Sequence, residues 1–591
     1  MGLPLLAFAF GTREGRVAFV LFEAPKNAAI QIFGWVLLAL LAWRLRDGFS
    51  IGAICAAARR PPWRWLGLFL ACAAATVGWV AVPANLFYEL SQYLLLFLLV
   101  LALEVWSDRD PAVPKIVEGA LVASLGVATV VGLIQGAFPI AALSPIDPGS
   151  GVANPSFLGY KNPMALALVG QIFLLAGGCL RRGVECRSGR LLALLLAAEA
   201  VYLATLKSRT SYLALVGATV LLGVLWLARE GISRRVLRAG LAAAAVAVLF
   251  VGVLAIDAGS RDRALSALSF ARHPARFLES DRGTYLVNSI HMARLRPLGV
   301  GFGDWQTQYP VFRQVRRDVY FTPTVQVRSA HGDHAQYLAE TGWPGFLLWA
   351  CFWGSLLALP VREFLRSGEP RAALVAAQAA AYGLAMATDY VAQHPYLKFE
   401  FLLVSFLAAR VARKPADPND LLPVGRSRFG AALAVTVLAV AVSTYQVMSL
   451  RKAWLGARFT SEYLLADDRG DAARAEPAIR DGDAMVRIPG YHKELSDTYR
   501  LLADLKLRLG RREEALADLR RSLRLSPYSP NALALMAKAL ADRPSEAAAW
   551  SRAATYVMNE ATDGFNRPYP PAALEWKVIS PGRAGPGRAP R

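Results

Sequence analysis

Charged residues are scarce in this chain of 591 residues, making up 18% of it against roughly 25% in soluble domains. This scarcity argues against a string of soluble domains, which the length alone would suggest. Hydrophobic residues make up 55% of the chain, and its mean hydropathy is +0.35. They come in blocks of about 16 to 24 residues, close to the ~20 that cross a bilayer as a helix. The composition therefore predicts a polytopic membrane protein.

Cysteine and histidine are also few. The five cysteines lie in or near apolar blocks without disulfide or metal spacing, and we interpret them as small core residues: Cys55, Cys72, Cys179, Cys186 and Cys351. Four of the six histidines fall between residues 257 and 343: His273, His291, His331 and His334. No Cys/His/Asp set there suits zinc. We therefore expect no metal and no other cofactor.

The apolar blocks predict an all-α fold with about twelve spans. These are residues 28–45, 66–83, 88–106, 117–137, 163–180, 190–206, 211–228, 237–256, 344–359, 372–392, 398–412 and 429–448. Residues 1–11 are too short to span and lack the basic region of a signal peptide. They are either half of a span or a sign that the true start lies upstream.

Arginine and lysine predict the orientation, because short cytoplasmic loops carry the excess of them. The basic loops are 44–64, 181–190, 229–238, 361–368 and 410–428, whereas 83–87, 206–210 and 391–396 are short or nearly neutral. The N-terminus, the 142–162 loop, the 257–343 loop and everything after 448 are then outside. The 257–343 loop carries eleven Arg and no Lys, but loops of that length are exempt from the rule. We attribute the net charge of +21 to cytoplasmic loops and anionic lipid rather than to nucleic acid.

The chain after residue 448 predicts a soluble helical region. LLADLKLRLGRREEALADLRRSLRLSPYSP matches the 34-residue tetratricopeptide pattern, with Ala503, Gly510, Ala515 and Pro527 at its key positions and a weaker copy at Ala537 and Ala549. A generic helical hairpin is the alternative, and either would be a docking surface. The predicted divisions are 1–27, spans 1–8 in 28–256, the 257–343 loop, spans 9–12 in 344–448, a helical domain in 449–568 and a disordered basic tail in 569–591.

The stretch KSRTSYLALV connects two spans on the predicted outer side. Arg209 is either a snorkelling anchor at the membrane boundary or a ligand for an anion. The hydroxyls of Ser208, Thr210 and Ser211 favour the second interpretation. They can cap the following helix, whose N-terminal amides then face outside and attract an anion.

The stretch DRGTYLVNSIHMARLRPLGVGFGDW holds a second candidate site. Residues 283–295 can form an amphipathic helix with Tyr285, Ile290 and Met292 among its apolar positions and Arg282 at its start. A glycine-rich turn follows at Gly299, Gly301 and Gly303. Its spacing is not that of a Walker loop, so we expect a tight turn at the membrane surface and not a nucleotide site.

The stretch RSAHGDHAQYLAETGWPG places His331 and His334 at the base of a span, beside the arginine-rich loop. A lone loop histidine is usually unremarkable. Arginine, however, grips a diphosphate bidentately and keeps its proton, and histidine accepts a proton near neutral pH. An outward-facing pocket of both predicts a lipid-linked diphosphate donor and an acceptor hydroxyl that must be activated.

These motifs occur in a distinctive order: SRT, then R-x-x-x-x-x-x-S-I-x-M-x-x-x-x-P-L-G-V-G-F-G-D-W, then AHGDHAQYLAETGWPG before a span. Over roughly residues 22–412 this order resembles the O-antigen ligase/polymerase superfamily. That group includes lipopolysaccharide O-antigen ligases, O-antigen and exopolysaccharide polymerases, and bacterial protein O-oligosaccharyltransferases. GYKNPMALALV (159–169) is similar to the family's G-x-x-N-x-x-A before a span, and FEAPK (22–26) to its Pro-Lys.

The resemblance implies a GT-C-type, metal-independent, inverting glycosyltransferase in the bacterial inner membrane, with undecaprenyl-diphosphate-linked glycan as donor. Carried over by position, Arg209 and Arg282 would hold the donor diphosphate and stabilise it as the leaving group. His331 would be the general base for the acceptor hydroxyl, or a further phosphate contact. The acceptor would be a glycan, a lipid A-core or a protein; membrane lipids and a protein partner of the tail are the other expected contacts.

Two positions depart from the family pattern. Gly332 follows His331 where the family often has Asn, and His334 stands where an aromatic residue is common. His334 is therefore either a further substrate contact or a supporting or surface residue. Asp389, at the outer edge of a span, is either a substrate-binding acid or the partner of an outer-loop arginine.

Three function classes stay open at this point. The leading one is a glycan-transferring enzyme, within which ligase, polymerase and protein glycosylation are not separated. A lipid-glycan transporter is the second, although transporters place charges at the bilayer midplane and these spans hold few, chiefly Glu104 and Glu199. A membrane-anchored scaffold that works through the tetratricopeptide-like region is the third.

Overall fold

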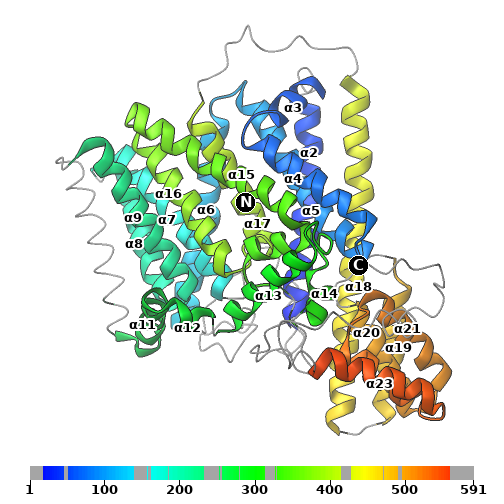
Figure 1. The fold of residues 1–591 in the computed structure, drawn as a ribbon. Helices are drawn as coiled ribbons and strands as arrows, with labels where there is room; N and C mark the ends of the chain where they lie inside the picture. The colour runs from blue at the N-terminus through cyan, green and yellow to red at the C-terminus, as the bar shows by residue number, and fades with distance from the viewer. Residues whose placement is uncertain are drawn as a thin grey trace.

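The computed structural model describes residues 18–44, 51–138, 156, 161–183, 185–231, 252, 256–278, 280–312, 327, 329–413, 428–469, 472–489 and 495–559. Within these ranges the regular secondary structure is helical (Figure 1). The membrane part contains α2 (Ala18–Arg44), α3 (Ile51–Ala58), α4 (Trp63–Ala75), η1 (Thr76–Gly78), α5 (Pro83–Ser107), α6 (Val113–Ala137), α7 (Lys161–Arg182), α8 (Arg187–Thr205), α9 (Arg209–Glu230), α15 (Asp333–Ser367), α16 (Pro370–Thr388), α17 (Pro395–Val411) and α18 (Arg428–Arg469).

Seven helices in the described ranges are long and apolar enough to cross a membrane: Pro83–Ser107, Val113–Ala137, Lys161–Arg182, Arg187–Thr205, Arg209–Glu230, Asp333–Ser367 and Ala432–Thr460. Shorter apolar helices cover Asn27–Trp43 and Trp63–Gly78. Helices α16 and α17 occupy two further predicted spans. The span 237–256 lies outside the described residues apart from two isolated positions. The chain is thus a multi-pass helical protein, and the number twelve stays a prediction.

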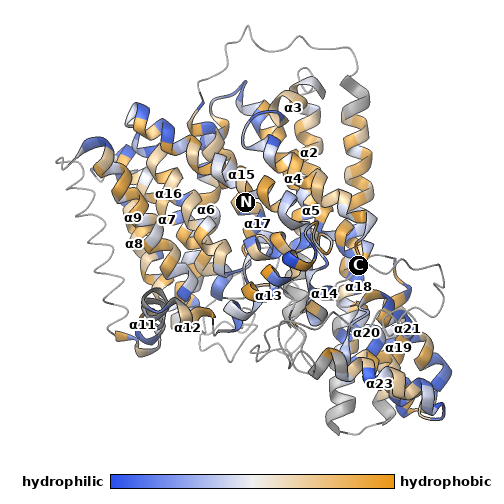
Figure 2. Ribbon diagram, in the orientation of Figure 1, coloured by the Kyte–Doolittle hydropathy of each residue, from blue (hydrophilic) through white to orange (hydrophobic). Residues whose placement is uncertain are grey.

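The outer surface of the helix bundle is apolar, as a surface facing lipid must be. Leu40, Leu194, Val216 and Val440 are each 60–68% exposed. Figure 2 shows that hydrophobic residues predominate along these helices. Exposed apolar area on this scale is unfavourable in water.

The bundle has two chemically different ends. The loop end carries the described residues between 256 and 332, including α11 to α14. The other end, which we call the basic end, holds the facing ends of α2 and α3, of α7 and α8 and of α15 and α16 (Figure 1). Among the described residues, the helix ends next to the loops predicted to be cytoplasmic therefore gather at one end, and those next to the predicted outer loops at the other. Consecutive predicted spans run in opposite directions, so successive loops fall at alternate ends of the bundle.

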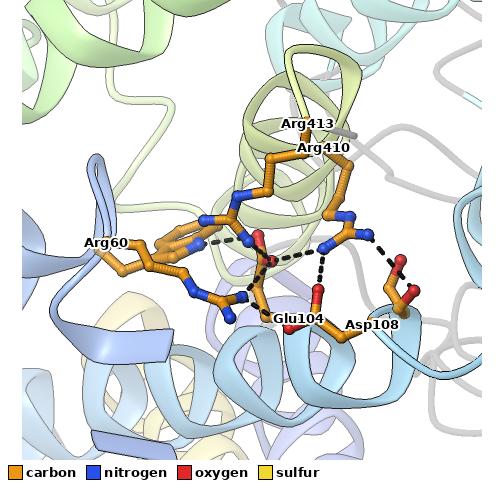
Figure 3. Close-up of polar contacts among 7 residues, drawn as sticks. Arg60, Glu104, Asp108, Arg410 and Arg413 are labelled. Atoms are coloured by element: carbon orange, nitrogen blue, oxygen red, sulfur yellow. Dashed lines mark hydrogen bonds and ion pairs between the residues drawn. The ribbon is translucent and has the colours of Figure 1, made fainter. Parts of the chain in front are cut away.

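Glu104, one of the two predicted intramembrane charges, lies at the basic end in a network of arginines (Figure 3). Its carboxylate is 3.4 Å from Arg410 and also pairs with Arg413. Asp108 lies 2.7 Å from Arg60 and also contacts Arg410. The network ties α5 to α17 and to the chain before α4. Because Glu104 is 0% exposed and paired with arginines, its charge is compensated within the protein.

The loop end is built from α11 (Ala258–Arg272), α12 (Pro274–Leu278), α13 (Asp281–Leu295) and α14 (Trp305–Phe312). Helix α13 begins at Asp281, two residues before the predicted start at 283, and ends at the predicted Leu295; the Ser280 hydroxyl caps it by accepting a hydrogen bond from the amide of Gly283 at 3.3 Å. Tyr285 and Met292 are buried, but the prediction for Ile290 is wrong: it is 38% exposed. The buried stripe runs through Tyr285, Ser289 and Met292, and Ile290 lies one position away from it.

The glycine turn between α13 and α14 locks this segment onto the bundle. Gly299, Gly301 and Gly303 have φ values of 84°, 119° and 79°, so the predicted tight turn is confirmed. A Cβ at Gly299 would lie 2.2 Å from the carbonyl oxygen of Glu340. The amide of Gly301 donates to the same oxygen at 3.0 Å. The Asp304 carboxylate then accepts from the amide of Ala81, at the start of the chain leading into α5, at 3.0 Å.

The C-terminal part contains α19 (Ala472–Arg487), α20 (Leu495–Arg508), α21 (Arg512–Leu525), α22 (Pro530–Ala539) and α23 (Pro544–Asn559). Helix α18 continues from the membrane into this part without a break at the predicted boundary of 448/449. Gly510, with φ of 75°, turns α20 into α21, and Ala503 and Ala515 are buried between them. The helical hairpin is therefore present, and its identity as a tetratricopeptide repeat stays a prediction. The predicted disordered tail lies outside the described residues.

The interpretation of the cysteines as core residues is wrong. Cys55, Cys186 and Cys351 are exposed, and Cys72 and Cys179 are partly buried; all five are free thiols. Cys186 sits at the start of α8, where its sulfur accepts from the amide of Gly189 at 3.3 Å. Apolar sequence neighbours mark a cysteine as membrane-embedded or near it, but do not say which face of a helix it occupies.

Candidate functional site

Arg282 lies at the centre of a polar cluster at the loop end. One terminal nitrogen of its guanidinium (Nη1) donates to the Thr210 hydroxyl at 2.5 Å and to the Thr388 carbonyl at 2.7 Å. The other, Nη2, lies 3.1 Å from the Asp389 carboxylate. Among contacts with described residues, these bonds use three of the five N–H groups. Two donors therefore remain for an anion, and 27% of the side chain is exposed.

The cluster joins segments far apart in sequence. Thr210 belongs to the SRT motif at the start of α9, and Asp389 ends α16. Arg209, the neighbour of Thr210, donates to the hydroxyl of Ser266 on α11 at 3.1 Å. The structure thus brings Arg209, Arg282 and Asp389 to one place, as expected if they act together. Asp389 is 1% exposed and pairs with Arg282, which corresponds to the second of its two interpretations.

The hydrogen bonds at the start of α9 differ from the predicted side-chain cap. Ser208 occupies the N-cap position, but its hydroxyl makes no bond to a backbone amide of the helix. It lies 2.9 Å from the hydroxyl of Ser211 instead. Thr210 turns to Arg282. The helix start therefore keeps amides that are not satisfied by its own side-chain cap, and such amides favour a negative charge nearby.

His331 lies beside Arg282 in an aromatic enclosure. Its ring stacks on Tyr285, with centroids 5.7 Å apart, and meets the edge of Tyr390 at 5.0 Å. The residue has φ of +48°, a backbone conformation uncommon outside glycine, which is typical of functional sites. Its Nδ1 atom is buried and has no hydrogen-bond partner among the described residues. An unpaired nitrogen of this kind is costly unless a ligand uses it.

Burial sets the protonation state of this imidazole. It lowers the pKa of His331 from about 6.5 to about 4, the Asp389 carboxylate opposes this lowering, and the Arg282 charge adds to it. The ring is therefore neutral at pH 7. A neutral imidazole with a free Nδ1 can accept a proton or a hydrogen bond from a hydroxyl.

His334 occupies a different environment although it is only three residues further on. Its Nδ1 accepts from the indole of Trp349 at 3.0 Å, and its Nε2 lies 3.0 Å from the carbonyl oxygen of Gly383. Both ring nitrogens are thus used: the contact with Gly383 holds α15 against α16, and the bond from Trp349 joins two parts of α15 itself. The geometry corresponds to a supporting residue, and the predicted substrate contact would require these bonds to break.

Asp333 was not among the predicted site residues, yet it positions the turn that carries two of them. Its carboxylate accepts from the amide of Ala392 at 2.7 Å, and the residue is 0% exposed. The turn before Ala392 holds Asp389 and Tyr390. An acid in the first turn of a helix, two residues after the candidate base, is the sequence signal for this role. Tyr390 gave no signal, because its contact with His331 is purely tertiary.

The starts of three helices meet at this cluster: α9 at Arg209, α13 at Asp281 and α15 at Asp333. Contacts between Arg282 and Thr210, and between Tyr285 and His331, hold them together. Each start carries a partial positive charge. Two arginines, Arg209 and Arg282, and the neutral His331 lie at the same place. Within the described ranges no group of three or more His, Cys, Asp or Glu suits a metal.

The fold and the cluster define a class: a multi-pass α-helical membrane protein with a cluster of arginine and histidine side chains at one end of its bundle. Residues 191–350 match the family model described as O-antigen ligase. The matched segment contains Arg209, Arg282 and His331, and supports a glycosyltransferase-like O-antigen ligase or polymerase function. A comparison with curated proteins finds no match.

Proposed function

We propose that the chain transfers a glycan from undecaprenyl diphosphate to an acceptor hydroxyl, at the loop end and on the outer face of the bacterial inner membrane. The observation that carries the proposal is the neutral His331, whose buried Nδ1 lacks a partner among the described residues, beside an Arg282 with donors to spare. A donor diphosphate and an acceptor hydroxyl are the complementary groups.

The reaction is a direct displacement. The acceptor oxygen forms a bond to the anomeric carbon while the bond from that carbon to the diphosphate oxygen breaks, so the configuration inverts. The hydroxyl proton passes to Nδ1 of His331, and the negative charge of the departing diphosphate is held by Arg282 and Arg209 together with the start of α9. Positioned cations at a developing charge are usually the largest single contribution to such a transfer. Bringing the diphosphate near the imidazole would also raise its pKa and strengthen it as a base.

The test is transfer by the purified protein from a polyprenyl-diphosphate glycan to a hydroxyl acceptor. His331→Ala and Arg282→Ala should each lower the rate by at least ~10². His273→Ala is the matched control, because His273 lies in the same loop and is exposed. Unchanged transfer by both site variants would refute the proposal. Product length separates a ligase, which adds one unit, from a polymerase.

Exposed residues at the two ends of the bundle allow a test of the predicted membrane orientation. Cys55 and Cys186 are exposed at the basic end, whereas His273 is exposed at the loop end. In spheroplasts, a membrane-impermeant maleimide should label a His273→Cys variant and spare both native cysteines. Labelling of Cys55 and Cys186 instead would place the site in the cytosol, where the carrier's glycan is not expected.

One observation favours a lipid-glycan transporter as the second candidate. Glu199 on α8 and Glu400 on α17 are 0% and 2% exposed, and carboxylate oxygens of both lack hydrogen-bond partners among the described residues. Buried acids within a membrane are often functional. A variant with both changed to Gln should keep glycan transfer if the chain is an enzyme. Loss of glycan translocation in vesicles, with transfer absent from the wild type, would favour the transporter.

A further inference from the structure

Tyr528, in the turn between α21 and α22, belongs to two hydrophobic cores at once. It packs against the core of the C-terminal helices, which includes Leu516 and Leu533. It also packs against the loop-end core, which includes Tyr285 and Trp305. Helix α14 contacts α23 beside it, and Figure 1 shows these two helices next to each other. The C-terminal part is therefore not a free appendage.

The loop-end core is the surface on which the candidate base rests. Trp305 and Tyr309 stack with centroids 4.4 Å apart, and both meet the edge of Tyr285, at 6.3 and 5.8 Å. Tyr285 also stacks with the His331 ring, with centroids 5.7 Å apart. Close-packed aromatic side chains transmit displacements because they have few alternative arrangements. Tyr528 packs against the core that contains these rings, so a movement of Tyr528 disturbs the packing on which the imidazole rests.

A second attachment fixes the C-terminal part to the membrane bundle. Phe459 on α18 is 0% exposed and packs with Ile479 on α19 and Leu502 on α20. Helix α18 itself packs along α2. With α18 as a rigid extension of a membrane helix and Tyr528 as the distal contact, the helical domain is held between two points. Its position relative to the site is thereby determined.

We propose that Tyr528 is a positioning residue. Through Tyr528 and the aromatic core, the C-terminal helical domain fixes the position of the His331 imidazole and keeps water away from it. The inference rests on the proposed function of His331. It also gives the domain an intramolecular task in addition to any docking of partners, since a partner that shifts α21 and α22 would shift the base.

The first experiment tests the contact without using activity. A photoreactive benzoylphenylalanine replaces Tyr528 in the full chain in membranes, and the crosslinked peptides are identified by mass spectrometry. We expect crosslinks to residues 285–339. The matched control places the same group at Tyr499, whose ring lies under Arg521 at 5.8 Å and should crosslink within the C-terminal helices. Crosslinks from position 528 to the C-terminal helices alone would overturn the inference.

The second experiment measures the coupling to catalysis. Tyr528→Ala should lower kcat by ~10-fold to 100-fold, as a small misplacement of a reacting group does, with little change in the KM for the donor. Water entering the loosened core should raise the pKa of His331 from about 4 towards its usual 6.5, so the acid limb of kcat/KM moves to higher pH. Tyr528→Phe, which keeps the ring, should restore both, and Tyr499→Ala should change neither.

The outcomes separate the two proposals. A Tyr528→Ala protein with the wild-type kcat and pH profile would refute the positioning role, whatever His331→Ala does. Full activity of His331→Ala, together with crosslinks to residues 285–339, would refute the base and leave the contact standing. If Tyr528→Ala does not fold, Tyr528→Leu and the crosslinking decide the question.

Discussion

The substitution Arg282→Met best separates the contribution of Arg282 to stability from its contribution to glycan transfer. It removes the bonds to Thr210, Thr388 and Asp389, at 2.5, 2.7 and 3.1 Å, and leaves the 1% exposed Asp389 carboxylate without its cation. Removing one partner of a buried pair costs about 3–5 kcal/mol. Because 27% of the arginine side chain is exposed, we expect the lower end, about 3 kcal/mol.

A second substitution separates the two roles. In Arg282→Met with Asp389→Asn no buried charge is left, so most of the lost stability should return, with a coupling free energy of up to about 3 kcal/mol. Glycan transfer should stay lost, because the diphosphate still has no guanidinium to hold it. Equilibrium unfolding in detergent micelles, followed by tryptophan fluorescence, measures the stability. The transfer rate at saturating donor measures the activity. Arg261→Met, at an exposed arginine of the same loop, is the control and should change neither.

Recovered transfer in the double variant would refute the reasoning, because Arg282 would then serve the fold alone. An unchanged unfolding free energy in Arg282→Met would refute it differently. In that case the ion pair with Asp389 would be too well hydrated to contribute, as exposed pairs usually are.

Further outcomes follow from the same geometry. Burial holds the pKa of His331 near 4, so the acid limb of kcat/KM should lie near pH 4. The histidine of the unfolded chain binds its proton already below about pH 6.5, so the free energy of unfolding should fall as the pH drops from 6.5 to 4. His331→Gln should lose this pH dependence of stability. His334→Ala strips Trp349 of its acceptor and should cost about 1–3 kcal/mol of unfolding free energy, with kcat of the folded protein retained. Gly342 has φ of 65°, and a Cβ there would lie 2.1 Å from the Pro297 carbonyl oxygen, so Gly342→Ala should abolish folding in a detergent-stability assay. Gly354→Ala on the same helix is the control and should be tolerated, because its Cβ meets nothing within 4 Å. A stable, active Gly342→Ala would contradict the role of the turn.

The membrane bundle follows from local sequence. Length and apolar content place a helix in a bilayer whatever its neighbours are, so nearly every predicted span in the described ranges coincides with a helix. Glycine and loop charge are equally local signals. The turn at Gly299 and the gathering of arginines at one end needed no knowledge of packing. Burial of a given side chain is not local, and the predictions for Ile290 and the cysteines failed for that reason.

Composition and motif order indicated on their own the helical class, the likeness to glycan transferases, and arginines 209 and 282 with His331 as candidates. Tertiary structure decided which groups meet: that Arg282 holds both Thr210 and Asp389, that Asp333 fixes the turn opposite, and that Tyr528 reaches the core beneath His331. Such contacts join residues more than fifty positions apart, and no spacing along a chain encodes them. They depend on how helices from separate spans pack, which only the whole bundle determines.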